Sequence, residues 1–115
     1  MSSADDCLFC NIVAGTIPAE IVYQNDLVLA FRDISPKAPT HLLVIPKLHA
    51  ENAVELAHKA PASLTAIYLA AGEIAKNENL DGYISFFTTG ETAGQTVFHA
   101  HLHLLSGRPF SWLPF

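Results

Sequence analysis

The sequence has 115 residues, which is enough for one compact domain and leaves little room for a second. Half of the residues are apolar, 15% are charged and the net charge is −5. The six basic residues are scattered along the sequence, which excludes nucleic-acid binding through a clustered basic surface as the function. The apolar share fits either a large core or a homo-oligomeric interface, and composition does not choose between them.

No apolar stretch reaches the roughly 18 residues that a membrane-spanning helix needs, so we expect no membrane partner. Residues 1–6 are acidic and lack the pattern of a signal peptide, so the expected location is the cytoplasm. Cys7 and Cys10 are too close in sequence for a disulfide between them to stabilise the fold. In a reducing compartment their spacing indicates a metal site or a redox pair.

In chain order, the first half is predicted to hold a short helix, a two-stranded hairpin and a third strand. The helix is capped by Asp5 or Asp6 and ended by Gly15. The strands are rich in β-branched and aromatic residues. The predicted ranges are 7–14 for the helix and 20–24, Val28–Arg32 and 41–45 for the strands.

The second half is predicted to hold two helices and two more strands. The helices cover residues 53–58 and 63–77, and the strands cover 83–88 and 97–105. The longer helix carries an apolar stripe at helical spacing: Leu64, Ile67, Tyr68, Ala71, Ile74 and Ala75. Hairpin strands with inserted helices are typical of an α+β domain with a mainly antiparallel sheet, here a single domain over residues 1–115.

Three of the six histidines occupy alternate positions of one predicted strand: His99, His101 and His103. Alternate side chains of a strand share one face, so the three imidazoles are expected to point to one side. The other side is expected to enter the core through Phe98, Ala100, Leu102 and Leu104. Three histidines on one strand face indicate either a zinc site or a nucleophile that attacks phosphorus. The alternative without a function is a partly exposed polar face of the sheet.

The segment Gly94-Gln95-Thr96 just before this strand favours phosphate. Glycine permits close backbone approach, successive turn N–H groups can form an anion-binding nest, and the Gln95 and Thr96 side chains add donors. A metal site has no need of such a nest. Taken alone, the segment would be an ordinary hairpin connection.

The motif His99-Ala100-His101-Leu102-His103-Leu104-Leu105 resembles the defining motif of the histidine-triad (HIT) family. Further segments resemble its Hint-like branch in order and spacing, among them residues 8–12, 15–19, 29–36, 38–47 and 94–98. The resemblance implies a five-stranded mainly antiparallel sheet with a long helix and a short N-terminal helix. It also implies a homodimer that joins two sheets into ten strands.

By this resemblance the chain is a hydrolase that cleaves the P–N bond of purine nucleoside phosphoramidates and releases AMP or GMP. His101 corresponds to the nucleophile that forms a nucleotidyl-histidine intermediate. His103 corresponds to a ligand of the phosphate and bridging atom, His41 lies near the leaving group, and His99 belongs to the active-site network. The remaining nucleotide-binding positions are Phe9, Ile12, Ile17, Phe31, Asp33, Ile34, Thr88, Gly94, Gln95, Thr96 and Val97.

Thr88 departs from the branch, which commonly has asparagine there, and the C-terminal tail from Pro109 is short. Some HIT proteins also have a structural Cys2His2 zinc, which here predicts zinc on Cys7, Cys10, His49 and His99. The alternative is a pair of free buried thiols. Catalysis itself is expected to require no cofactor.

Three alternative functions remain open from the sequence. The chain could cleave diadenosine polyphosphates, as another HIT branch does. It could be a zinc hydrolase that uses His99, His101 and His103 as ligands. It could also be a nucleotide-binding or scaffolding protein whose turnover is incidental.

Overall fold

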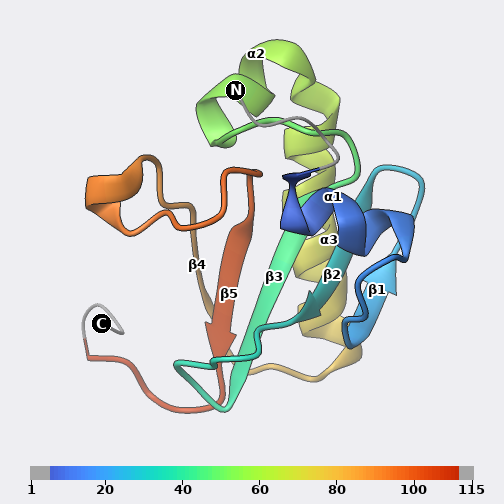
Figure 1. Ribbon diagram of the computed structural model, residues 1–115. Coiled ribbons are helices and arrows are strands. Elements are labelled where there is room, and N and C mark those ends of the chain that lie inside the picture. Colours follow the sequence, from blue (N-terminus) through green and yellow to red (C-terminus); the bar gives the residue numbers. More distant parts are fainter. Residues whose placement is uncertain (1–5, 112–115) are drawn as a thin grey trace.

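A five-stranded antiparallel sheet, in the order β1-β2-β3-β5-β4, organises the chain (Figure 1). The computed structural model describes residues 6–111. The helices are α1 (Leu8–Ala14), α2 (Ala53–Lys59), α3 (Pro61–Asn77) and the 3-10 turn η2 (Glu91–Ala93). The strands are β1 (Ile21–Gln24), β2 (Val28–Arg32), β3 (Thr40–Pro46), β4 (Ile84–Phe86) and β5 (Leu102–Ser106). The α+β class and the five-stranded sheet with a long and a short N-terminal helix are confirmed.

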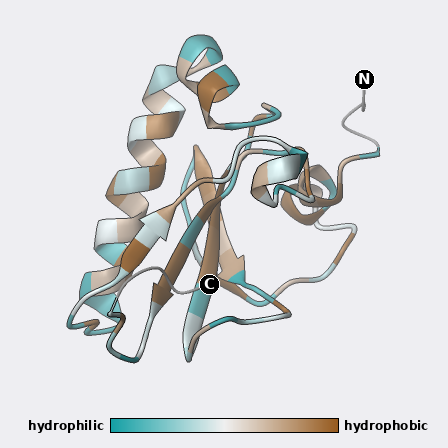
Figure 2. Cartoon of the chain, turned by 90° about the vertical axis from the view of Figure 1, so that its left-hand side faces the viewer, coloured by the Kyte–Doolittle hydropathy of each residue, from teal (hydrophilic) through white to brown (hydrophobic). Residues whose placement is uncertain are grey.

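Both faces of the central strands are covered by helices. Neighbouring residues of a strand point to opposite sides, so each face contributes its own set of apolar side chains. On one face α3 packs against Val28, Ala30, Leu42, Val44, Leu102 and Leu104. On the other face α1 packs against Leu29, Phe31, Leu43 and Ile45. Figure 2 shows the long helix on one side of the sheet and the short α1 on the other.

The buried stripe of α3 differs in part from the predicted one. It consists of Ser63, Ile67, Ala70, Ala71 and Ile74, whereas Tyr68 is 50% exposed. Small residues allow the helix to lie close to the sheet, and a tyrosine ring fits only at its margin. No helix in the described part of the chain is long and apolar enough to cross a membrane.

The cap of α1 also differs from the prediction. Cys7, not Asp6, is the N-cap, and its Sγ accepts the Cys10 N–H at 3.3 Å. Asp5 lies outside the described residues. Gly15 ends the helix as predicted, with φ of 82°, a left-handed conformation that favours glycine.

Strands β4 and β5 are shorter than predicted. Strand β5 begins at Leu102, so His99 and His101 precede it, and Phe98 is 41% exposed instead of entering the core. The reason is that residues 97–99 form a bend, after which Ala100 N–H donates to Ala50 O at 2.8 Å instead of to a strand partner. Strand β4 ends at Phe86, opposite His103, near the start of β5.

Candidate functional site

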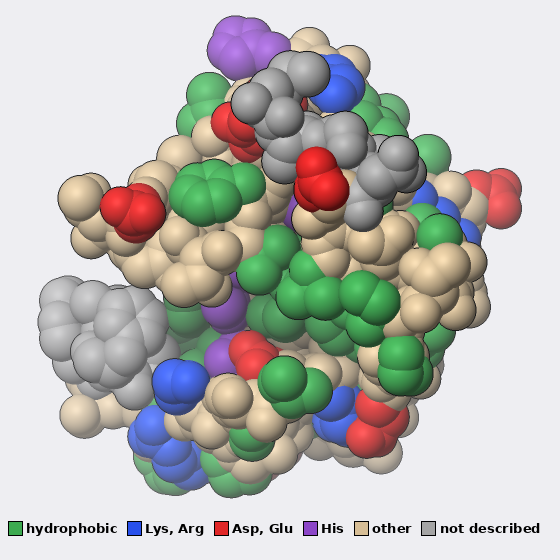
Figure 3. Space-filling view, in the orientation of Figure 1, with side chains coloured by type: hydrophobic (Ala, Val, Ile, Leu, Met, Phe, Trp, Pro, Cys, Tyr) green, Lys and Arg blue, Asp and Glu red, His purple; other side chains and the backbone are tan. Residues whose placement is uncertain are grey.

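Histidine side chains form the floor of a hollow in the middle of one face of the molecule, with apolar side chains beside them (Figure 3). His41 lies on β3 and His103 on the adjacent β5, on the same side of the sheet, and His101 comes just before β5. The rings of His101 and His103 have centroids 4.9 Å apart, and those of His41 and His103 are 5.3 Å apart. The structure therefore brings together three of the predicted catalytic residues.

His101 has a defined tautomer. Its Nδ1 lies 2.8 Å from the carbonyl oxygen of His99, and because a carbonyl only accepts, Nδ1 carries the hydrogen. Nε2 of the neutral ring then has a free lone pair. Burial is the largest influence on the pKa of His101 and lowers it, although the His99 carbonyl and Asp33 oppose the shift. His101 is thus held neutral at pH 7 and can act as a nucleophile or a base.

His41 and His103 form a hydrogen-bond chain. The Lys37 backbone N–H donates to Nδ1 of His41 at 3.0 Å, so the hydrogen of neutral His41 is on Nε2. That Nε2–H donates to Nδ1 of His103 at 3.0 Å. The hydrogen of neutral His103 is therefore on its own Nε2, where it can be donated to a bound molecule.

Both rings of this chain are neutral at pH 7. Burial lowers the pKa of His103 to about 4, with further lowering by His101 and His41. Burial also lowers the pKa of His41, although Asp33 acts in the opposite direction. Phe86 stacks on the His103 ring at 4.8 Å and 14°, which holds the plane of that ring.

Asp33, His41 and His103 have potential ligand atoms within 4.8 Å of one another. Nε2 of His41, which is 3.4 Å from Asp33 Oδ2, would have to offer a lone pair to a metal. The Lys37 N–H on Nδ1 places the hydrogen of His41 on that same Nε2. The group is therefore arranged for hydrogen bonding and not for a cation. Asp33 also accepts the Ser35 N–H at 2.8 Å, the turn contact typical of an aspartate that begins a loop.

The loop before the histidines is held by Gln95, which is 2% exposed. Its amide donates to Glu51 O at 2.6 Å and Val97 O at 3.1 Å, and its oxygen accepts the Gly90 N–H at 2.9 Å. Because both amide hydrogens are engaged, the expectation that the Gln95 side chain donates to phosphate is corrected: it shapes the loop. Thr96 is exposed, and Gly94 has φ of 96°.

Thr88 has a buried side-chain oxygen that has no hydrogen-bond partner among residues 6–111. The pairing of β4 with β5, continued by two residues, would place Thr88 opposite His101. A buried hydroxyl without a partner costs free energy unless a ligand or water supplies one. The observation makes Thr88 a candidate ligand contact even though it replaces an asparagine.

The apolar residues predicted to contact a base fall into two groups. Phe9, Ile12 and Phe31 are buried in the cluster between α1 and the sheet, so they offer little surface to a ligand. Ile17 is half-buried and Ile34 is 98% exposed, so these two keep surface that a base could cover.

A second cluster joins the start of α1 to distant segments. Nδ1 of His99 lies 3.3 Å from Cys7 Sγ and 3.4 Å from Cys10 Sγ, and Nδ1 of His49 lies 3.3 Å from Cys10 Sγ. His99 Nε2 is 2.8 Å from the Pro46 carbonyl oxygen, so it carries the hydrogen and Nδ1 turns its lone pair toward the thiols. Both cysteines are free.

This cluster fits zinc. Two sulfurs and two imidazole nitrogens are a zinc donor set, and Zn–S and Zn–N bonds of about 2.3 and 2.0 Å at tetrahedral angles put S and N about 3.5 Å apart. The four ligand atoms lie within 4.8 Å of one another. Without a metal, burial is the largest cause that raises the pKa of the Cys10 thiol, to about 12, followed by Cys7. His99 faces the two cysteines and lies apart from the other two triad histidines. This position argues against the alternative in which His99, His101 and His103 share one metal.

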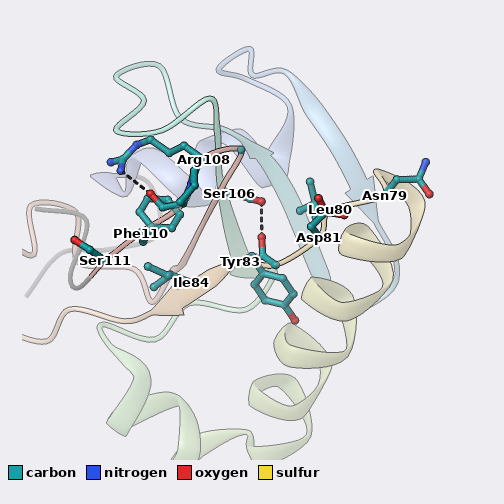
Figure 4. Close-up of a pocket in the computed structure, with 12 residues that line it drawn as sticks. Asn79, Leu80, Asp81, Tyr83, Ile84, Ser106, Arg108, Phe110 and Ser111 are labelled. Atoms are coloured by element: carbon teal, nitrogen blue, oxygen red, sulfur yellow. Dashed lines mark hydrogen bonds between the residues drawn. The ribbon is translucent and has the colours of Figure 1, made fainter.

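A cavity of about 890 Å³ lies away from the histidines (Figure 4). It is lined by residues 79–84 and 106–111, at the far end of β5. Ser106 Oγ donates to Gly82 O there at 2.6 Å, and Arg108 lies over the Phe110 ring at 4.4 Å. Its lining lacks a histidine or cysteine, so it offers no nucleophile of the kind found in the hollow.

Sequence patterns missed the groups that set the histidine tautomers, which are the Lys37 N–H and the carbonyls of Pro46 and His99. Backbone groups have no sequence signature. The alternation in the fourth strand could have indicated an aromatic neighbour for the triad, but not that Phe86 stacks on His103.

Comparisons with known proteins show what the chain as a whole is similar to. The sequence profile of the HIT domain matches residues 14–110. A purine nucleoside phosphoramidase of Escherichia coli is 43% identical over 108 residues, 92% of this chain and 91% of that protein. An uncharacterized HIT-like protein of Synechococcus elongatus is 46% identical over 112 residues, 96% of this chain and 98% of that protein. A HIT family hydrolase from Clostridium thermocellum has a TM-score of 0.91 at 37% identity and covers 96% of this chain and 98% of its own.

Proposed function

Because the chain belongs to the HIT domain family, we propose that it is a hydrolase that cleaves the P–N bond of purine nucleoside 5′-phosphoramidates through a covalent intermediate on His101. The observation that carries the proposal is the 2.8 Å hydrogen bond from His101 Nδ1 to the His99 carbonyl, which leaves a lone pair on Nε2 of a neutral ring. The phosphoramidase name of the Escherichia coli relative supports this substrate class.

In the first step, Nε2 of His101 attacks the phosphorus, the N–P bond to the ring forms and the P–N bond to the amine breaks. The Nε2–H of His103 donates a hydrogen bond to the leaving nitrogen, which takes up its proton from solvent water. The phosphorylated His101 ring is cationic, and the His99 carbonyl stabilises it by accepting its Nδ1–H.

In the second step, a water oxygen attacks the phosphorus and the bond to His101 breaks. The water proton returns to the solvent, which balances the proton taken up in the first step, and His103 keeps its Nε2–H. The products are a nucleoside monophosphate such as AMP or GMP and the free enzyme. His41 keeps Nδ1 of His103 in the accepting role throughout.

The nucleotide is proposed to lie with its phosphate over His101 and His103. The backbone at Gly94, Thr96 and Val97 and the orphaned Thr88 hydroxyl are the proposed phosphate donors. Asp33 is proposed to take the ribose hydroxyls, and Ile17 and Ile34 to contact the base, with Phe9, Ile12 and Phe31 packed behind them.

We further propose that Cys7, Cys10, His49 and His99 hold a structural zinc ion, since their donor set and spacing fit it. Bound there, the ion supplies cross-links between α1 and the segments that carry the two histidines. The ion itself makes or breaks no bond in the reaction.

A homodimer acting in the cytoplasm is proposed as well. Among the described residues, strand β4 lies at an edge of the sheet and pairs only with β5. Nearby, Tyr68, Leu69 and Tyr83 are large apolar side chains that are 40–70% exposed. An open strand edge beside exposed apolar side chains is suited to pairing with a second copy.

The test is turnover of an adenosine 5′-phosphoramidate beside diadenosine tetraphosphate, followed by AMP release. The wild type is expected to prefer the phosphoramidate, and His101→Ala to lose at least about 1,000-fold in kcat. His58→Ala is the matched control, because His58 is exposed on α2. A rapidly quenched reaction should carry one nucleotidyl group on His101. Preference for the dinucleotide, or full activity of His101→Ala, would refute the proposal.

A further inference from the structure

In the sequence, Phe9 lies between Cys7 and Cys10 of the proposed zinc cluster, and its ring contacts the proposed nucleophile, His101. Its ring meets the His101 ring edge-on, with centroids 5.1 Å apart and planes at 90°. It also contacts Phe31 at 5.4 Å and His99 at 6.0 Å, and it is only 4% exposed. A shift of the first turn of α1 would therefore move the group that supports one side of His101.

His99 connects the same cluster to His101 by a second route. Its Nδ1 faces Cys7 and Cys10, and its Nε2–H donates to the Pro46 carbonyl. Its own carbonyl accepts the Nδ1–H of His101, the hydrogen bond that sets the reactive tautomer. His99 is thus both a member of the cluster and the hydrogen-bond partner of His101.

The first turn of α1 needs external support. The helix has seven residues, and helices this short are not stable in water by themselves. Its N-cap is a thiol, Cys7, and the Cys10 thiol reaches across to His49 and His99. Thiol hydrogen bonds are weak, whereas zinc–thiolate bonds contribute folding free energy outright.

We propose that the Cys7–Cys10–His49–His99 cluster, when it holds zinc, positions the nucleophile by clamping Phe9 and the His99 carbonyl against His101. This inference rests on the proposed function. In it, Phe9 is a positioning residue and metal loading sets kcat. Nucleotide binding depends on it little, since the proposed phosphate and ribose contacts lie on other segments.

The experiment compares zinc-loaded and metal-free protein under reducing conditions, with zinc content measured directly. Removal of zinc is expected to lower kcat about tenfold or more with KM changed less than about threefold, because small misplacement of a reacting group acts on the chemical step. The ¹⁵N resonances of the His101 ring should shift or broaden at the same time, which reports position without any substrate.

Variants of Phe9 separate the route through the Phe9 ring from the route through His99. Phe9→Ala in loaded protein is expected to lose kcat while binding zinc normally, and zinc removal should then cost less than in the wild type. Phe9→Leu should restore part of the activity. Leu8→Ala is the matched control, since Leu8 is a neighbour on the same helix and is 43% exposed.

Two results would overturn the inference: a folded, metal-free protein with wild-type kcat and an unchanged His101 spectrum, or a protein that binds no zinc at all. Circular dichroism establishes that the metal-free protein is folded, and should it unfold, the comparison of Phe9→Ala with Phe9→Leu decides. If the wild type cleaves no phosphoramidate, the proposed function fails, while the His101 spectrum still tests the positioning.

Discussion

Nε2 of His41 lies 3.0 Å from Nδ1 of His103, and the Lys37 backbone N–H on the other side of the His41 ring decides which of the two donates. His41 therefore acts on the reaction through His103. It makes Nε2 of His103 the nitrogen that carries a hydrogen toward the substrate.

His41→Ala should slow the reaction without abolishing it. Loss of a residue that orients a catalytic ring typically costs about 10- to 100-fold, and we expect that range for kcat. The loss should be larger for substrates with a strongly basic amine than for those with a weakly basic leaving group, because the strongly basic nitrogen develops more negative charge for the His103 hydrogen bond to stabilise. Comparing kcat across such a substrate series, with His58→Ala as control, measures the effect. An equal loss for every leaving group would contradict it.

The pH dependence of kcat/KM should have an acid limb well below the ordinary histidine pKa of 6.5. The pKa values of His41 and His101 are lowered by burial, and that of His103 is lowered to about 4. The reactive rings are neutral above these values, so activity should be constant near pH 7 and fall as the pH drops toward 4. A limb centred at 6.5 or above would show that the rings are not shielded.

Stability should fall over the same acid range. A histidine with a lowered pKa in the folded state contributes its stability fully above the unfolded value and loses it as the pH falls through the folded value. For His103 that window runs from 6.5 down to about 4. Urea midpoints measured from pH 7.5 to 4.5 should decrease, and His103→Gln should make the decrease less steep. A slope unaltered by that substitution would assign the loss to other groups.

Gln95→Leu should weaken both the fold and nucleotide binding. Without the amide, Glu51 O, Val97 O and the Gly90 N–H lose a partner. We expect about 1–3 kcal/mol lost in the free energy of unfolding and a raised KM, because the loop next to the histidines loosens. Urea denaturation and steady-state kinetics check this, with the exposed Glu91→Ala on the same loop as control. Unchanged stability would mean that the loop is held by its backbone alone.

Thr88→Val separates stability from binding. The Thr88 hydroxyl has no hydrogen-bond partner in the part of the chain that the structure describes, so replacing it by a methyl group should leave the free energy of unfolding unchanged or higher. If the hydroxyl donates to the phosphate, KM should rise about tenfold. Thr88→Ser should keep KM near the wild-type value. A fall in stability without a change in KM would assign the hydroxyl to the fold.

Several structural features could be predicted from local patterns. Apolar periodicity predicted all five strands and the long helix, and Gly15 predicted the end of α1. The ends of β4 and β5 were wrong, because where a strand stops depends on where its partner is available. The core role of Phe98 was wrong for the same reason, since a bend carries residues 97–99 away from the regular alternation.

By itself the sequence determined which side chains are present and in what order: a histidine triad with alternating apolar residues, a glycine-containing loop before it and a Cys-x-x-Cys pair. These properties depend on spacing within a few residues. Only the tertiary structure decided which nitrogen of each ring carries a hydrogen and which rings meet which thiols. Those properties depend on groups far apart in the chain, such as Cys7 and His99, 92 positions apart, or the Pro46 carbonyl and His99, 53 apart. Packing of the whole sheet and its covering helices brings such groups together, and no local pattern encodes that.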